Sequence, residues 1–275
     1  MSRRSVVAGV LALVVAAPLA CQQPVLLRIN ARQGQVTRYQ TVVETFMQGG
    51  PMAAMGGDPS QPFQRMTMFN TRTLTDIVAD TLVYTEVIDS ARIEMPAMPQ
   101  AAAFAGGIAE QLRGTSTRTK MDRRARIFDT EVTGGLAASM GGGQGGPGGG
   151  RRGGMGGGGN QGKNMVFILP AGPVRPGDTW SDSVVIEGDQ GQPNSTFRAT
   201  FRFERMDGQV AVISLNGSLD MPMQGTVTTM ATTGEFRLDL AQSRLGSMNM
   251  TMSGTAQTQM GEMPMRIQMT TQAQP

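Results

Sequence analysis

Methionine is the residue type in this chain with the clearest potential for chemistry, because thioether sulfur atoms bind Cu(I). The chain contains 23 methionines, and methionines two residues apart recur along it. The recurring groups are Met66/Met68, Met221/Met223, Met248/Met250/Met252 and Met263/Met265. The same spacing places side chains on one face of a β-strand, where methionine packs as an adaptable apolar residue. The spacing therefore favours a methionine-rich apolar interior, either filled or open to an apolar ligand, with a Met-based Cu(I) site as an alternative.

Residues for acid/base or nucleophilic catalysis are few. Histidine is absent, which excludes Ser-His-Asp and Cys-His catalysis and imidazole zinc sites. Ser116 and Lys120 are close in sequence and offer a Ser-Lys dyad. The closest acidic pairs lack the accompanying pattern of an acid/base site, and they are Asp76/Asp80, Glu86/Asp89, Asp129/Glu131 and Asp178/Asp182. We therefore expect no enzyme activity, no catalytic, metal or cofactor-binding residue and no cofactor, with an unrecognised hydrolase as the alternative.

Cys21, the single cysteine, follows a segment typical of protein export. Arg3 and Arg4 precede the apolar residues 6–17, a stretch too short to span a bilayer. The residues Ala17-Pro18-Leu19-Ala20-Cys21 resemble the lipobox of bacterial lipoproteins, which implies acylation of Cys21. An ordinary cleavage site beside an incidental cysteine is the alternative, and both the general secretory and the twin-arginine routes stay open.

These features predict a compartment and a set of partners. We expect residues 1–20 to be an export signal and residues 21–24 a tether to a membrane through lipid at Cys21, on the periplasmic side of the cell envelope. Removal of Arg3 and Arg4 from the 24 basic residues leaves 22 against 21 acidic residues. This near-balance does not favour nucleic acid as a partner. An apolar ligand or another envelope protein fits better.

Alternation of apolar and polar residues with a period of two predicts a mainly β fold with antiparallel strands. Expected hairpins and strands cover residues 66–95, 115–133, 197–221, 226–258 and 263–269. Residues 101–112 carry the one helical pattern. Curved sheet, half-barrel and sandwich all satisfy this pattern.

A glycine-rich tract divides the chain into two halves of similar order. Residues 136–165 are expected to form a flexible loop, because ordering so many glycines costs more entropy than packing returns. The first β half covers residues 25–135 and the second covers residues 166–275. Arg32-Gln33-Gly34-Gln35 and Arg175-Pro176-Gly177-Asp178 each lead into a strand that carries an aromatic residue. The parallel suggests a duplicated unit.

Three short motifs resemble an uncharacterised family of extracytoplasmic bacterial lipoproteins. They are Leu26-Leu27-Arg28-Ile29 before Gly34 to Tyr39, Leu112-Arg113-Gly114-Thr115 before a hairpin, and the segment from Phe167 to Trp180 with its Gly-Asp-x-Trp strand entry. Such proteins have a helical connection where this chain has its glycine tract. The resemblance implies location and fold and transfers no activity. The sequence thus predicts a lipid-anchored extracytoplasmic module for binding or for envelope structure.

Overall fold

The computed structural model describes residues 23–48, 60–98, 102–134, 167–186, 194–223, 226–258 and 261–275. The expected export signal, Cys21 and the glycine-rich tract at 136–165 lie outside the described residues. Within the described residues the fold is mainly β with one short helix, as the sequence predicts. The helix expected at 101–112 is α2, which runs Ala102–Leu112 and packs against β3 (Thr81–Glu94). Gly114, with a φ of 74°, follows the end of α2.

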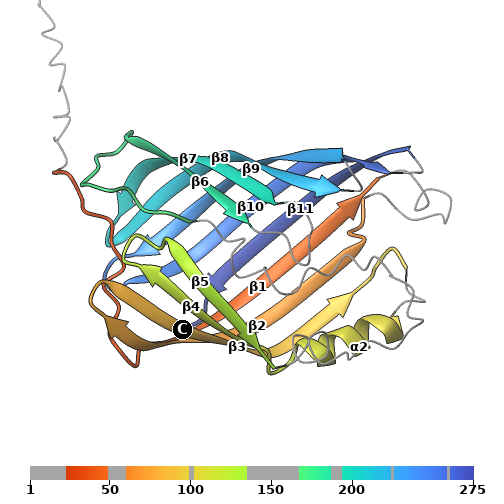
Figure 1. Ribbon diagram of the computed structural model, residues 1–275, viewed down its shortest axis with the longest axis horizontal. Coiled ribbons are helices and arrows are strands. Elements are labelled where there is room, and N and C mark those ends of the chain that lie inside the picture. Colours follow the sequence, from red (N-terminus) through yellow and green to blue (C-terminus); the bar gives the residue numbers. More distant parts are fainter. Residues whose placement is uncertain are drawn as a thin grey trace, which may run out of the picture.

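Eleven antiparallel strands form one open sheet, with β5 and β6 at its two edges (Figure 1). The other strands are β1 (Val36–Met47), β2 (Gln64–Val78), β4 (Ser116–Asp122), β5 (Ile127–Thr133), β6 (Thr179–Ile186), β7 (Ser195–Asp207), β8 (Val210–Met223), β9 (Thr226–Asp239), β10 (Arg244–Thr258) and β11 (Gly261–Ala273). The spatial order is β5-β4-β3-β2-β1-β11-β10-β9-β8-β7-β6. A single open sheet excludes a sandwich of two sheets and agrees with the curved sheet or half-barrel among the expected forms.

The strands of the two sequence halves meet in the middle of this sheet. β1 pairs with β11 from Tyr39 opposite Ala273 to Met47 opposite Met265. Every strand pair before and after this one joins consecutive strands of the chain, so the sheet is a meander on each side. The two halves therefore share one sheet.

The turns that lead into β1 and β6 have the same hydrogen-bond pattern. Gly34, at a φ of 80°, donates its N–H to the carbonyl of Leu74 at 2.8 Å. Gly177, at a φ of 94°, donates in the same way to the carbonyl of Phe203 at 2.7 Å. A positive φ of this size is open to glycine at little cost. The repeated turn is what a duplicated unit predicts, and the duplication stays a prediction.

Two segments without regular structure cross the inner, concave face of the sheet, and we name them the first strap (residues 25–31) and the second strap (residues 167–174). Val25 and Val174 pair through two backbone hydrogen bonds of 2.8 and 2.9 Å, which join the straps. Leu27 of the first strap and Leu169 of the second are fully buried. The straps therefore fill the part of the inner face next to the turns β2–β3, β4–β5 and β7–β8.

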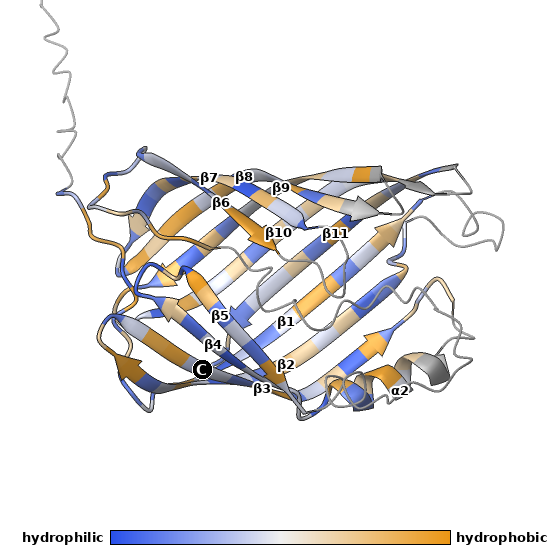
Figure 2. Ribbon diagram, viewed as in Figure 1, coloured by the Kyte–Doolittle hydropathy of each residue, from blue (hydrophilic) through white to orange (hydrophobic). Residues whose placement is uncertain are grey.

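Aromatic side chains form the centre of this filled region. Phe201 and Phe203 alternate along β7, as the sequence predicts, and both are fully buried. Phe167 of the second strap stacks on Phe236 of β9, with ring centroids 4.6 Å apart. Trp180 stacks on Phe201 at 5.7 Å. Figure 2 shows the apolar and polar bands that alternate along the strands.

Candidate functional site

The inner face of the sheet has a second apolar region beyond the straps, which we name the open half. It lies at the other ends of the central strands. Buried methionines from β1, β9 and β11 form its centre, namely Met47, Met230 and Met265. Partly buried side chains surround them, namely Phe63, Leu219, Met221, Met252, Met263 and Ile267. Strand register explains the grouping, because Met47 lies opposite Met265 and alternate residues share a face.

The open half and the strap-covered half differ in exposure. Under the straps, Leu74, Phe203 and Ile213 are fully buried. In the open half, Met252 and Met263 remain partly exposed among the described residues. Ligand sites are lined mainly by apolar side chains, and partial exposure leaves those of the open half accessible to a ligand.

The methionines of β10 confirm the predicted alternation. Met248 and Met250 are 1% and 8% exposed, and both pack in the strap-covered half. Met252, two residues further, contacts both apolar regions and is partly exposed. Asn249 and Ser253 are exposed on the opposite face. This burial favours the packing role of these thioethers, and Cu(I) binding stays a prediction.

Two threonine hydroxyls lie among the methionines without a hydrogen-bond partner. Thr232 is fully buried and Thr228 is 3% exposed, and the Oγ1 atom of each lacks a partner. Both belong to β9, on the face of Met230. A buried hydroxyl without a partner costs free energy that an added acceptor or donor recovers. The open half therefore has apolar walls and two buried hydroxyls without a partner, and no sequence pattern indicates these hydroxyls.

A polar cluster lies on the same face of β2 and β3, at the border of the straps. Arg72 donates from Nε to Oε2 of Glu86 at 2.7 Å, and its Nη2 lies 2.6 Å from the same oxygen. Asn70 donates from Nδ2 to Oε1 of Glu86 at 2.9 Å. The Arg72 guanidinium lies 5.6 Å from the ring centroids of both Tyr39 and Tyr84. The guanidinium is thus held by one carboxylate and two aromatic faces.

Charge and burial shift the pKa values within this cluster. Burial raises the pKa of Tyr84 to about 12, against the opposing charge of Arg72. Burial also raises the pKa of Tyr39. Burial disfavours the charge on Arg72, but Glu86 outweighs this effect and raises the arginine pKa above its ordinary value. At neutral pH both tyrosine hydroxyls are therefore protonated, and Arg72 stays charged within its ion pair with Glu86.

Sequence reasoning missed this cluster. Glu86 was identified only as a neighbour of Asp89, and the structure places Asp89 against the hydroxyl of Thr71 instead. The available signal was the alternation in β2, where Arg72 shares a face with the apolar Leu74. A charged residue on the apolar side of a strand is uncommon unless it is paired.

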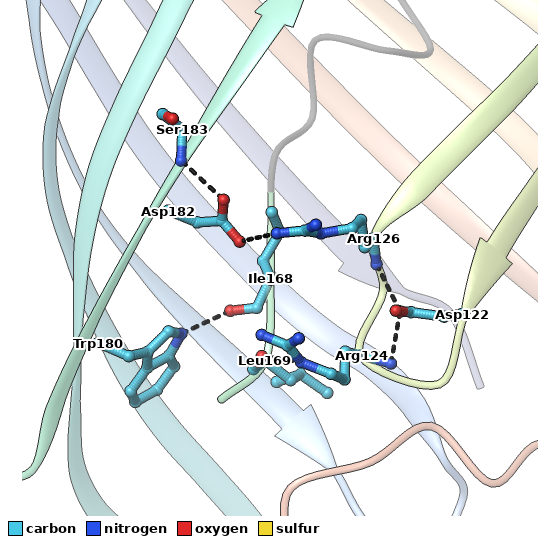
Figure 3. A network of polar contacts seen from close by, with 8 residues as sticks. All are labelled: Asp122, Arg124, Arg126, Ile168, Leu169, Trp180, Asp182 and Ser183. Atoms are coloured by element: carbon cyan, nitrogen blue, oxygen red, sulfur yellow. Dashed lines mark hydrogen bonds and ion pairs between the residues drawn. The ribbon is translucent and has the colours of Figure 1, made fainter. Parts of the chain in front are cut away.

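The two edges of the sheet are linked where the second strap passes between them (Figure 3). Arg126, just before β5, donates to Oδ2 of Asp182 in β6 at 2.7 Å. Trp180 donates from Nε1 to the carbonyl of Ile168 at 2.7 Å. Arg124 and Leu169 exchange two hydrogen bonds, one from Nε of Arg124 and one from N–H of Leu169. The second strap therefore joins the two edges of the sheet through these contacts, and Trp180 packs against the core.

Among the described residues, the side chains considered for catalysis do not lie close enough to act together. Ser116 and Lys120 lie four residues apart on the same strand, which separates them by about 13 Å. Lys120 instead pairs with Asp129 of β5 at 2.7 Å. Asp178 accepts a hydrogen bond from the N–H of Arg175, in the turn before β6. Within the described residues, no three acidic or cysteine side chains gather as a metal site.

Comparison with known proteins gives one result. Residues 160–261 match a family of unknown function, DUF6263. This agrees with the resemblance to an uncharacterised family. A search of curated proteins finds no match to the chain. No helix in the described part of the chain is long and apolar enough to cross a membrane.

Proposed function

We propose that this chain is a lipid-anchored extracytoplasmic binding module that holds an apolar chain against the open half of its inner face. The observation that carries the proposal is the contrast between the two halves of one apolar face, fully buried under the straps and partly exposed beyond them. Methionine suits this role, because its unbranched, polarizable side chain adapts to apolar ligands of varied shape.

A charge placed in the open half is expected to weaken binding of an apolar ligand. Met252→Lys puts an ammonium group on the inner face, whereas Ser253→Lys puts the same group on the outer face one residue later. We expect Met252→Lys to reduce the affinity for 1-hexadecanol at least tenfold, because burying a lysine charge beside an alkyl chain is costly. Ser253→Lys is expected to leave the affinity unchanged. Calorimetric titration of both variants checks this, and equal affinities would remove the open half as the site.

The anchor is tested separately from the ligand. Cys21→Ala removes the thiol that lipid would modify, and the export segment before it is unchanged. Stable anchoring takes two or more acyl chains, so their loss is expected to move most of the protein from the membrane fraction to the soluble fraction. Fractionation followed by immunoblotting measures this. Retention of Cys21→Ala in the membrane fraction would contradict the tether.

A further inference from the structure

Nearly all the sulfur in this chain is thioether sulfur. The chain has 23 methionines and one cysteine, Cys21, for which acylation is predicted. Two-electron oxidants such as hydrogen peroxide convert the methionine thioether to a sulfoxide, which replaces an apolar group by a polar one. An oxidant in solution reaches exposed sulfur atoms before buried ones. The exposure of each methionine therefore decides where this chemistry takes place in the folded chain.

Neighbouring methionines of the inner face differ in their access to solvent. On β10, Met248 and Met250 are buried, whereas Met252 is partly exposed. On β11, Met265 is buried, whereas Met263 is partly exposed. The difference follows the border between the strap-covered half and the open half on β10, and the border between the centre and the surrounding side chains of the open half on β11. A peroxide in solution therefore has access to Met252 and Met263.

The two unpartnered threonine hydroxyls of β9 lie opposite two partly exposed methionines. Thr232 lies opposite Met252 of β10 on one side and opposite Gly217 of β8 on the other. Thr228 lies opposite Met221 of β8, which is also partly exposed. Directly opposite residues of antiparallel strands have Cβ atoms about 5 Å apart, so their side chains are within reach of each other. Because Gly217 has no side chain, Met252 is the direct cross-strand side-chain neighbour of Thr232.

Oxidation changes what these methionines offer to the threonines. A thioether sulfur is a weak hydrogen-bond acceptor, and the Oγ1 atoms of Thr228 and Thr232 have no partner in the reduced chain. A sulfoxide oxygen carries a partial negative charge and accepts hydrogen bonds well. Oxidation of Met252 therefore supplies the acceptor that the Thr232 hydroxyl lacks, and oxidation of Met221 does the same for Thr228. Each new hydrogen bond recovers part of the desolvation cost of a buried hydroxyl.

From these observations we propose that Met221 and Met252 are sites of oxidation by hydrogen peroxide, and that their sulfoxides lower the affinity of the open half for its ligand. The sulfur atom gives two electrons to one peroxide oxygen, an S–O bond forms and the O–O bond breaks. The other oxygen leaves as water with both hydrogen atoms of the peroxide. Each sulfoxide accepts a hydrogen bond from its threonine and makes the ligand site polar, which disfavours an alkyl chain. The effect on binding rests on the proposed function, whereas the oxidation does not.

The first measurement locates the oxidation without any ligand. The folded full-length chain is treated with hydrogen peroxide, and after removal of the peroxide it is unfolded and digested with trypsin. One tryptic peptide, residues 245–266, carries the buried and the partly exposed methionines of β10 together. We expect sulfoxide to form about tenfold faster at Met252 than at Met248 and Met250. Fragment-ion mass spectrometry measures these rates, and equal rates at the three residues would overturn the proposal.

Thr232→Val tests the hydrogen bond to the sulfoxide. Valine keeps the shape of the side chain and removes the unpartnered hydroxyl, so the reduced variant is expected to be at least as stable as the unmodified chain. Peroxide treatment is expected to lower the denaturant midpoint of Thr232→Val by more than that of the unmodified chain, because the Met252 sulfoxide then lacks its donor. Thr233→Val, on the exposed outer face one residue later, is the matched control. Equal shifts for the two valine variants would contradict the proposed hydrogen bond.

The effect on binding is measured with 1-hexadecanol before and after peroxide treatment. We expect oxidation to lower the affinity of the unmodified chain about tenfold. Met221→Leu/Met252→Leu/Met263→Leu keeps the apolar volume of the open half, and it is expected to retain its affinity after the treatment. Met248→Leu/Met250→Leu alters buried methionines only, and it is expected to lose affinity as the unmodified chain does.

The outcomes separate the two proposals. If the untreated chain does not bind 1-hexadecanol, the proposed function and the effect of oxidation on binding are overturned together, while the sulfoxide pattern still decides where oxidation takes place. If the untreated chain binds and keeps its affinity with sulfoxide present at Met221 and Met252, the effect of oxidation is overturned and the proposed function stands. An equal loss in the triple leucine variant and the unmodified chain would also overturn the effect.

Discussion

Replacement of Phe201 by alanine is expected to lower the free energy of unfolding by about 4 kcal/mol. Phe201 is fully buried in β7 and packs on Trp180, Phe236 and the second-strap residue Phe167. Its removal leaves a cavity where the strap meets the sheet, and the surrounding aromatic rings fill that space only in part. The expected loss of stability combines the transfer free energy of the removed ring with the free energy of the cavity that it leaves.

Phe128→Ala is the matched control for Phe201→Ala. Phe128 lies on β5 and is 56% exposed. We expect its truncation to change the free energy of unfolding by less than about 1 kcal/mol. Chemical denaturation followed by the fluorescence of Trp180 measures both variants. Similar costs for the two phenylalanines would mean that the second strap does not seal the covered half.

The second large effect is expected at Gly217, where β7 and β8 approach closely. A Cβ atom added at Gly217 would lie 2.2 Å from the carbonyl oxygen of Arg198 and 3.0 Å from Cα of Ala199. Both are backbone atoms of the paired strand, so neither moves without disturbing the ladder between β7 and β8. Gly217→Ala is therefore expected to destabilise the chain by about 3 kcal/mol.

Replacement of Gly107 in α2 by alanine is expected to have the opposite effect on stability. Nothing lies within 4 Å of a Cβ atom added at Gly107, and alanine is the better helix former. Gly107→Ala is expected to stabilise the chain by up to about 1 kcal/mol. Thermal unfolding of the two variants gives the sign of each change. A neutral Gly217→Ala would show that the β7–β8 ladder accommodates a methyl group at this position.

Local pattern was sufficient to predict much of the fold. The hairpin expected within residues 66–95 is formed by β2 and β3, and Ala79 in its turn has a positive φ of 53°. Met248 and Met250 were assigned to the apolar face because a strand has a period of two, and they are buried. Such features depend on neighbours a few residues away, and sequence patterns report those neighbours directly.

Long-range placement could not be predicted in the same way. The β1–β11 pairing joins residues more than 200 positions apart, for example Thr41 and Thr271, whose hydroxyls lie 3.1 Å apart. The second strap carries the apolar run Phe167-Ile168-Leu169, which has no strand or helix period to reveal that it crosses an inner face. The Arg72 cluster likewise forms only when separate strands come together. Its residues come from β1, β2 and β3, and no spacing in the sequence joins them.

The central claim is that an apolar chain occupies the open half of the inner face, and photo-crosslinking tests it most directly. The probe is a hexadecanol with a diazirine in its alkyl chain, and peptide mass spectrometry locates the modified residues. We predict labels on inner-face residues such as Met47, Met252 and Met265. Labels on exposed outer residues such as Phe69 and Val227, with none on these methionines, would contradict the account.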